Sequence, residues 1–224
     1  MCRTMLTLLP IVGLVGSNNL STAIIILGIG VILIFAASPR YIQFAALGGA
    51  GIGFIAIFLA AESYRLERLA IWREPEKYEK GFQTIQGLYA IGSGGLFGRG
   101  IGNSIQKLGF VPEAQNDMIF SIICEEMGLT GAIILILIFA LLLWRLCVIS
   151  MNCQELSGAM IAAGIMGHLA IQVILNIAVV TNTIPNTGIT LPFISYGGTS
   201  IVFLLGEMGL ALNVSRQKNN PPTR

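Results

Sequence analysis

Five apolar runs, each about as long as a membrane-spanning helix, constrain the fold of this chain more than any other feature. They cover residues 20–37, 41–61, 129–149, 158–180 and 194–214. The hydrocarbon core of a bilayer is about 30 Å thick, so a spanning helix needs about 20 apolar residues. Since backbone polar groups inside the bilayer need internal partners, we predict an all-α, polytopic transmembrane helix bundle. A composition of 54% hydrophobic and 11% charged residues excludes an ordinary soluble domain.

A sixth apolar run, residues 5–16, is too short to cross the bilayer alone. Arg3 precedes it, as in a signal peptide, but Pro10 interrupts its centre and no clean cleavage site follows. We therefore predict a partial N-terminal helix in addition to five full spans. The whole chain, 1–224, is expected to form one membrane domain with a long extracytoplasmic loop at residues 62–116.

The distribution of basic residues predicts the orientation of the chain, because Lys and Arg favour the cytoplasmic side. One side would carry Arg40, Arg145, Arg216, Lys218 and Arg224. The connections 17–19 and 181–193, on the other side, contain neither Lys nor Arg. The C-terminus is therefore expected in the cytoplasm. Basic and acidic residues nearly balance in the long loop, so nucleic-acid binding is not expected.

Cysteine and glycine patterns add two expectations. The cysteines lie mostly in or near apolar helices, and no Cys/His spacing suits zinc, so neither disulfides nor a protein-held metal cluster is predicted. The stretch "GLYAIGSGGLFGRGIGN" has neither a P-loop nor a Rossmann spacing and is predicted to be a glycine-kinked re-entrant or interfacial segment. Glycines in the spans 41–61 and 158–180 favour close helix packing.

Asp117 is the only aspartate of the chain, and it lies where a polar segment meets an apolar run. A helix over residues 117–149 would be about 50 Å long, about 20 Å more than the bilayer core. A bend at 128–131 is the one expected interruption. With Arg145 at the cytoplasmic end, the surplus would place Asp117 near the outer headgroups. Asp117 could act there as a helix N-cap, as a catalytic carboxylate, or as both.

Other polar residues lie inside the predicted spans. His168, Gln172 and Asn176 form one stripe on a helix, where they could make interhelical hydrogen bonds or line a polar cavity. Glu207 is a functional candidate because ionisable groups are costly in a membrane. Glu125 and Glu126 are interpreted as orienting or structural residues.

Three motifs resemble the SEDS family (shape, elongation, division, sporulation), which includes FtsW, RodA and SpoVE. They are "NNLSTA", "NSIQKLGFVPEAQNDMIFSIICEEMGLTGA" and "IPNTGITLPFISYGGTS", and the resemblance extends over nearly the whole chain. The segment "EMGLALNVSR" is more similar to FtsW or SpoVE than to RodA.

The resemblance implies a peptidoglycan glycosyltransferase with ten transmembrane helices in the bacterial cytoplasmic membrane. Such an enzyme polymerises lipid II into glycan strands at the outer face during division or cell-shape maintenance. The implied partners are lipid II, the growing strand, a class B penicillin-binding protein, divisome or elongation proteins, and membrane lipids. The family has about four more helices before "NNLSTA", so an incomplete substrate cavity and an inactive fragment are also expected alternatives.

The resemblance places the catalytic aspartate of the family on Asp117. Gln115 and Asn116 stand where the family commonly has His-Thr, which leaves Asp117 as the base. The transfer would be inverting, and undecaprenyl diphosphate would leave without needing a proton, so one base suffices. Arg99 and Lys107, or a divalent cation such as Mg²⁺ or Mn²⁺, would stabilise the leaving group, unless the two side chains are simply solvated loop charges. The candidate substrate-binding residues are Arg99, Lys107, Glu113, Gln115, Glu125 and Ser195.

Two other functions remain open from the sequence. A lipid II transporter (flippase) would depend on the polar groups inside the bundle, such as His168, Gln172 and Glu207. A non-catalytic division scaffold would depend neither on Asp117 nor on these polar groups. A single aspartate at the headgroup layer favours the enzyme.

Overall fold

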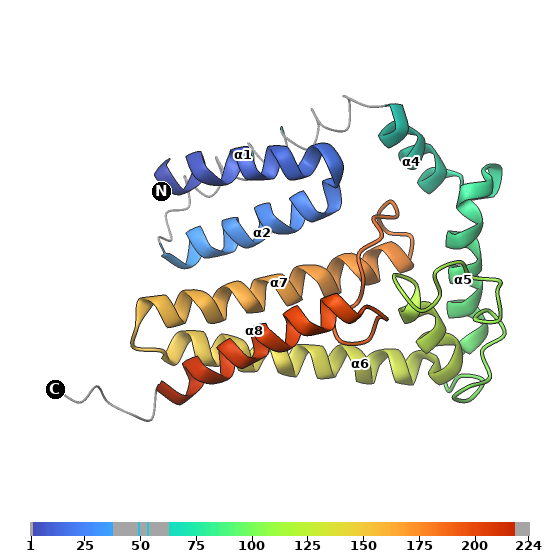
Figure 1. The fold of residues 1–224 in the computed structure, drawn as a ribbon. Helices are drawn as coiled ribbons and strands as arrows, with labels where there is room; N and C mark the ends of the chain where they lie inside the picture. Colours follow the sequence, from blue (N-terminus) through green and yellow to red (C-terminus); the bar gives the residue numbers. More distant parts are fainter. Residues whose placement is uncertain (1, 38–48, 50–52, 54–62, 218–224) are drawn as a thin grey trace. The chain divides into compact units, whose positions relative to one another are not determined.

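The computed structural model describes residues 2–37, 49, 53 and 63–217, and these residues form helices and loops without a β-strand (Figure 1). The α-helices are α1 (Cys2–Asn18), α2 (Leu20–Ala37), α4 (Ser63–Arg73), α5 (Phe82–Gly94), α6 (Ile119–Asn152), α7 (Leu156–Val180) and α8 (Gly198–Gln217). Two 3₁₀ helices, η1 (Pro75–Lys77) and η2 (Glu79–Gly81), lie between α4 and α5. The predicted all-α class is confirmed.

Among the described residues, four helices are long and apolar enough to cross a membrane: α2, α6, α7 and α8. The predicted runs 20–37 and 158–180 are confirmed as helices. The run 194–214 is wrong at its start, because the chain remains in a loop until Gly198 and Phe193 has a positive φ of 63°. Apart from Gly49 and Gly53, the run 41–61 lies outside the described residues. The number of spans stays a prediction.

The short N-terminal run, predicted as a partial helix, lies within α1, which continues through Pro10. Asn19 lies between α1 and α2 and is the N-cap of α2. Its Oδ1 accepts a hydrogen bond from the backbone N–H of Thr22 at 3.2 Å. A Cβ added to Gly30 of α2 would lie 3.0 Å from both terminal methyl groups of Leu8. The two helices therefore pack closely where a glycine permits it.

The chain divides into two compact units. The first contains residues 1–62, 143–171 and 203–224, and the second contains residues 63–142 and 172–202. In the first unit, a Cβ added to Gly167 of α7 would lie 2.9 Å from the Ile32 side chain, and Gly164 faces Leu33. The predicted role of the α7 glycines in close packing is confirmed. The assignment of 1–224 to one membrane domain stays a prediction.

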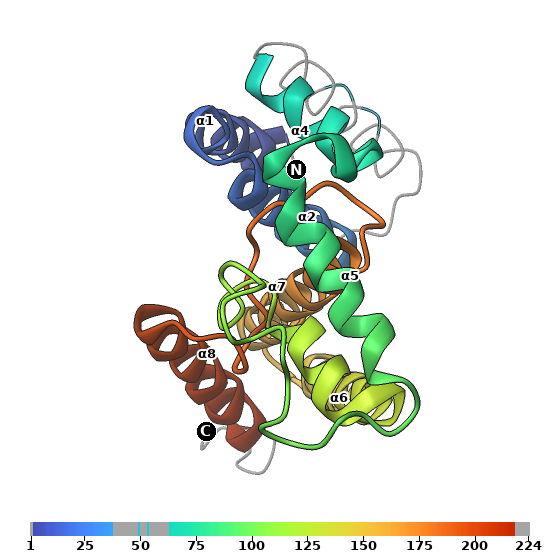
Figure 2. The ribbon, with the colours of Figure 1, turned by 90° about the vertical axis from the view of Figure 1, so that its right-hand side faces the viewer.

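The second unit contains the segment predicted as a long loop, and much of it is helical. Helix α5 leads from the α4 and 3₁₀ region to an irregular loop before α6 (Figure 2). Its hydrophobic core joins the start of α6, the end of α7 and the loop that follows α7. The buried members of this core are Val111, Met118, Phe120, Ile122, Cys124, Ala132, Phe139, Val173, Val180 and Leu191.

Helix α6 breaks at Gly128, whose φ of 66° and ψ of −165° are not helical. A Cβ there would lie 2.4 Å from the backbone N of Gly98, so the loop approaches too closely for any other residue. The predicted helix start at Asp117 is wrong, because α6 starts at Ile119, whereas the expected bend at 128–131 is confirmed by the break at Gly128. Residues 129–152 alone extend about 36 Å, enough to cross the bilayer core.

Candidate active site

Asp117 lies two residues before α6, in the second unit, with only 7% of its surface exposed. Three groups hold the backbone before the helix. Asn176 Nδ2 donates to the carbonyl of Asp117 at 2.8 Å, Ser195 Oγ donates to the carbonyl of Asn116 at 2.7 Å, and the N–H of Tyr196 donates to the carbonyl of Gln115 at 2.8 Å. The fold therefore brings the segment "PEAQND" together with the segment "LPFISYGG".

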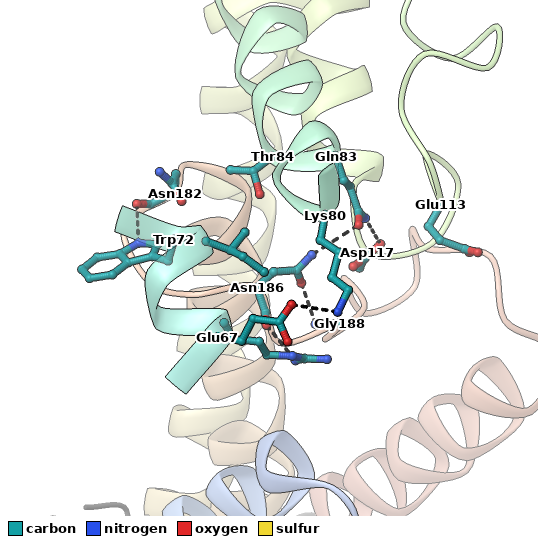
Figure 3. A pocket seen from close by; sticks show the side chains of 12 residues that line it. Glu67, Trp72, Lys80, Gln83, Thr84, Glu113, Asp117, Asn182, Asn186 and Gly188 are labelled. Atoms are coloured by element: carbon teal, nitrogen blue, oxygen red, sulfur yellow. Dashed lines mark hydrogen bonds and ion pairs between the residues drawn. The ribbon is translucent and has the colours of Figure 1, made fainter. Parts of the chain in front are cut away.

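The carboxylate of Asp117 is held by a chain of side-chain amides from α5 and the loop after α7. Oδ1 of Asp117 accepts a hydrogen bond from Gln83 Nε2 at 3.3 Å, and Gln83 Oε1 accepts one from Asn186 Nδ2 at 3.5 Å. Asn186 Oδ1 in turn accepts the N–H of Gly188 at 2.9 Å. A backbone N–H can only donate, so it orients both amides and presents a donor to Asp117. Figure 3 shows Gln83 between Asn186 and Asp117.

Burial raises the pKa of Asp117 above its ordinary value, and the nearby charge of Glu113 adds to this effect. Hydrogen bonds from the backbone of Asp117 and Met118 and from Gln83 lower it in part. The helix starts at Ile119, so the N-cap position belongs to Met118 rather than to Asp117. A carboxylate with a raised pKa is a stronger base than a solvated aspartate.

Asp117 faces a polar pocket with a volume of about 330 Å³. It is lined by Glu67, Arg68, Ile71, Trp72, Lys80, Gln83, Thr84, Glu113, Asp117, Asn182, Asn186 and Gly188 (Figure 3). Helix α4 is attached to the loop after α7 by Trp72 Nε1, which donates to the carbonyl of Asn182 at 2.9 Å, and by Arg68, which donates to the carbonyl of Asn186 at 2.9 Å. The pocket therefore combines a buried carboxylate with the cationic side chains of Arg68 and Lys80.

The two cations proposed from the sequence, Arg99 and Lys107, are paired with glutamates of α6. Arg99 lies 3.5 Å from Glu125, and Lys107 Nζ lies 2.6 Å from Glu126. Glu125 is fully buried and also accepts hydrogen bonds from Ser104 Oγ at 2.5 Å and from two backbone N–H groups of the loop. These contacts fit the orienting or structural role expected for Glu125 and Glu126, while the substrate-binding role predicted for Glu125 stays a prediction.

The remaining predicted residues lie around Asp117. Glu113 lines the pocket of Asp117 and also a second pocket of about 590 Å³, which it shares with Gln115 and Lys107. Glu113 has a positive φ of 53° and accepts a hydrogen bond from Asn116. Ser195 is buried, and its Oγ also accepts the N–H of Leu191 at 2.7 Å. Ser195 therefore supports the backbone next to Asp117.

The polar stripe of α7 has two kinds of partners. In the first unit, His168 Nδ1 lies 2.9 Å from Oε1 of Glu207 on α8. In the second unit, Asn176 donates to the carbonyls of Asp117 and Ile189, both at 2.8 Å. Hydrogen bonding between segments is therefore the observed role of both residues.

Sequence reasoning missed several pocket residues: Glu67, Arg68, Trp72, Lys80, Gln83, Asn182 and Asn186. Glu67, Arg68, Trp72 and Lys80 lie in the charged part of the predicted loop, "ESYRLERLAIWREPEKYEK", whose composition does not indicate which side chains face a pocket. Arg68 and Trp72 are four residues apart and so share one face of α4. This spacing was the sequence signal that could have indicated a common binding surface. Among the described residues, no group of three His, Cys, Asp or Glu side chains could hold a metal ion.

Comparison with known proteins identifies relatives over most of the chain. The chain is 45% identical to the stage V sporulation protein E of Bacillus subtilis over 201 residues, which is 88% of this chain and 55% of that protein. It is 37% identical over 214 residues to the "Probable peptidoglycan glycosyltransferase FtsW" of Trichlorobacter lovleyi, covering 94% of this chain and 56% of that protein. The chain thus spans about half the length of the curated relatives it matches.

Solved structures agree with this relationship. A chain from a peptidoglycan synthase complex, studied for its coordination of polymerization and crosslinking, superposes with a TM-score of 0.78 at 28% identity, over 97% of this chain and 62% of that chain. The rod shape determining protein RodA of Thermus thermophilus matches with a TM-score of 0.65 at 27% identity, over 99% and 57% of the two chains. The fold described above is therefore shared with both.

The family model for FtsW, RodA and SpoVE, described as "Cell cycle protein", matches residues 1–220. This match confirms the resemblance inferred from the three motifs, and the apolar helices fit a multi-pass membrane protein. The chain therefore belongs to the FtsW/RodA/SpoVE family, the SEDS family of multi-pass membrane proteins.

Proposed function

We propose that this chain carries the catalytic region of a peptidoglycan glycosyltransferase, which polymerises lipid II into glycan strands. One observation carries the proposal: the only aspartate of the chain is buried at the edge of a polar pocket, and its backbone is held by Asn176 of α7 and by Ser195 of the motif "IPNTGITLPFISYGGTS". The name of the FtsW relative, a probable peptidoglycan glycosyltransferase, supports the same activity.

In the proposed reaction, Asp117 is the general base. It takes the proton of an acceptor sugar hydroxyl while the hydroxyl oxygen attacks the anomeric carbon of the donor sugar. The new C–O bond forms as the bond to the diphosphate breaks, with inversion, and undecaprenyl diphosphate leaves with the bonding electrons. Because Oδ1 accepts a hydrogen bond from Gln83, the proposal assigns the proton to Oδ2.

Arg68 and Lys80 are the proposed partners of the leaving diphosphate, because both line the pocket of Asp117. Lys80 also lies 3.0 Å from Glu67, but this pair is largely exposed, and exposed pairs contribute only about 0–1 kcal/mol, so a diphosphate can compete for the lysine. Arg99 and Lys107 are instead paired with Glu125 and Glu126. A divalent cation, if bound with the substrate, would use substrate phosphates and the carboxylate of Glu113, which lines the same pocket.

The proposed location is the outer face of the bacterial cytoplasmic membrane, with the C-terminus in the cytoplasm. Residues 129–152 are long enough to cross the bilayer alone, so Asp117 and residues 119–127 would extend beyond the hydrocarbon. Arg145, in the C-terminal part of α6, and Arg216, in the last turn of α8, would then lie toward the cytoplasm. At the outer face Asp117 would meet the headgroups of lipid-linked sugars.

The proposed partners follow from the relatives. The peptidoglycan synthase complex matched by this chain couples polymerization to crosslinking, which supports a class B penicillin-binding protein as the crosslinking partner. Divisome or elongation proteins would bring this pair to its site of action.

The test uses fluorescent lipid II in vesicles containing either this chain or a chimera. In the chimera, the chain replaces its matched region in the FtsW relative, which supplies the remaining length. Asp117→Asn should lower polymer formation by about 10²–10⁴-fold, the usual contribution of a general base. Wild-type polymerisation by Asp117→Asn would reject the proposal. Movement of lipid II without polymer would indicate a transporter, and partner binding alone a scaffold.

A further inference from the structure

The loop of residues 95–110, between α5 and α6, exposes large apolar side chains, and its charged side chains are paired with glutamates of α6. Six large hydrophobic residues of this loop are exposed: Leu96 at 62%, Phe97 at 81%, Ile101 at 80%, Ile105 at 49%, Leu108 at 74% and Phe110 at 49%. A loop that faces water normally has the opposite arrangement. An exposed apolar patch of this kind marks a surface that contacts a membrane or a protein.

The polar groups of the 95–110 loop are directed toward α6. The loop contains two charged residues, Arg99 and Lys107, and both are paired with glutamates at the start of α6. The backbone N–H groups of Ile105 and Gln106 donate to Glu125, and that of Ser104 donates to Glu126. The charges of the loop are therefore compensated by α6, although 39% of the Arg99 side chain and 33% of the Lys107 side chain remain exposed.

Backbone hydrogen bonds attach the loop at the start of the spanning part of α6. The N–H of Leu129 donates to the carbonyl of Gly95 at 2.9 Å, and the N–H of Thr130 donates to the carbonyl of Leu96 at 3.1 Å. Leu129 and Ile133 of α6 are themselves about half exposed, as expected of residues that face lipid. The apolar surface of the loop is thus continuous with the apolar surface of the span.

We propose that the 95–110 loop inserts its apolar side chains into the leaflet of the membrane on the side of Asp117. The continuity with α6 identifies lipid acyl chains, rather than another protein, as the occupant of this surface. The proposal concerns membrane contact and does not depend on the glycosyltransferase activity.

The backbone of the loop limits how deeply it can enter. Its conformation is irregular, with positive φ at Gly95, Gly98, Gly100 and Gly102, so its N–H and C=O groups are not all paired as in a helix. Unpaired backbone groups are not tolerated in the lipid-exposed hydrocarbon core. The backbone should therefore remain at the headgroup level while side chains such as Phe97 and Ile101 reach about 5–10 Å into the boundary with the acyl chains.

The test measures contact with lipid tails by tryptophan fluorescence of the full chain in vesicles. Phe97→Trp and Ile101→Trp are made in a Trp144→Phe background, which removes the tryptophan of the α6 span. Both positions are about 80% exposed, so the substitutions leave the packing unchanged. The matched control is Tyr78→Trp, an aromatic residue 40% exposed in the charged segment between η1 and η2.

Lipids with brominated acyl chains should quench the emission of Phe97→Trp and Ile101→Trp relative to the background protein, with a shift to shorter wavelength. The emission of Tyr78→Trp should not change. Emission at 97 and 101 that is unaffected by bromolipids but quenched by aqueous acrylamide would overturn the proposal. Equal bromolipid quenching at all three positions would also overturn it, because contact with acyl chains would then not be specific to the 95–110 loop.

Discussion

The side-chain nitrogen of Gln83 lies 3.3 Å from Oδ1 of Asp117 and donates a hydrogen bond to it. Gln83 is itself oriented by Asn186, which is oriented by the N–H of Gly188. A donor at this position favours the ionised carboxylate, while burial disfavours it. The balance between the two effects determines how Asp117 responds to pH.

Replacing Gln83 by Leu should leave less of Asp117 ionised at a given pH, because a hydrogen bond that lowers its pKa is lost. The substitution removes the donor while keeping a similar size, and a hydrogen bond to a charged group is worth about 1.5–3 kcal/mol, or about 10–100-fold in an equilibrium. We expect a similar loss of polymerisation, with the acidic limb of the pH–rate profile moved to higher pH. The control is Gln86→Leu on the same helix, which should retain the wild-type profile. An unchanged profile for Gln83→Leu would rule out a positioning role.

The Asn substitution of Asp117 should change the pH dependence of stability as well as activity. Below the ordinary aspartate pKa of about 3.9, the folded and unfolded states both hold the proton. As pH rises, the unfolded state releases it first because the folded pKa is raised, so the free energy of unfolding falls until the folded carboxyl also ionises. Asp117→Asn should therefore be at least as stable as the wild type at pH 7, without this fall. Thermal unfolding in detergent from pH 4 to pH 7 measures the difference.

Arg68 and Arg99 should have separable effects. If Arg68 binds the leaving diphosphate, Arg68→Gln should reduce turnover of lipid II by about tenfold or more, since hydrogen bonds to charged groups are worth about 1.5–3 kcal/mol. Arg68→Lys should restore part of it. Arg99→Gln should mainly loosen the contact with Glu125, so turnover per folded molecule should change less. A larger turnover defect in Arg99→Gln than in Arg68→Gln would indicate that Arg99, the cation proposed from the sequence, binds the leaving diphosphate.

Ser104→Ala should release the 95–110 loop. The hydroxyl of Ser104 lies 2.5 Å from Oε2 of Glu125, so its loss should increase transient opening of the loop by about tenfold or more. Trypsin cleavage after Arg99 and Lys107 in detergent reports this opening. Ser93→Ala serves as the control, because Ser93 Oγ donates only to the carbonyl of Ala90 on its own helix. Equal cleavage rates in the two variants would contradict the role of Ser104.

Gly128→Ala should destabilise the protein strongly. Its positive φ alone would cost an alanine about 1–3 kcal/mol, and the added Cβ would also collide with the backbone of Gly98. Gly206→Ala in α8 is the matched control, since a Cβ there meets nothing within 4 Å and Ala is the better helix former. Thermal unfolding should therefore separate the two variants, and similar melting temperatures would argue against a required break at Gly128.

The helices were largely predictable because apolar length alone specifies a membrane span. The run 20–37 coincides with α2, and 158–180 differs from α7 by two residues at its start. The start of α8 was misplaced because residues 194–197 are apolar or small, yet Ser195 and Tyr196 are hydrogen-bonded to the segment before Asp117. Composition cannot reveal that a long-range contact keeps an apolar segment out of a helix.

The importance of Asp117 could be predicted from its rarity and its place at a polar boundary, but its surroundings could not. Gln83 and Asn186 are more than 100 positions apart in the chain and meet only through the fold. Arg68 and Lys80 lie in a segment with many charged residues, and the sequence does not indicate which of these line the pocket of Asp117. The pairing of Arg99 and Lys107 with α6 likewise depends on the break at Gly128.

The contacts that hold residues 115–117 end on main-chain carbonyls, which every amino acid possesses. The side chains at positions 115 and 116 can therefore be replaced without loss of these contacts. The contacts depend instead on the donor side chains of Asn176 and Ser195. Replacing either donor would remove its hydrogen bond whatever residues stand at positions 115–117.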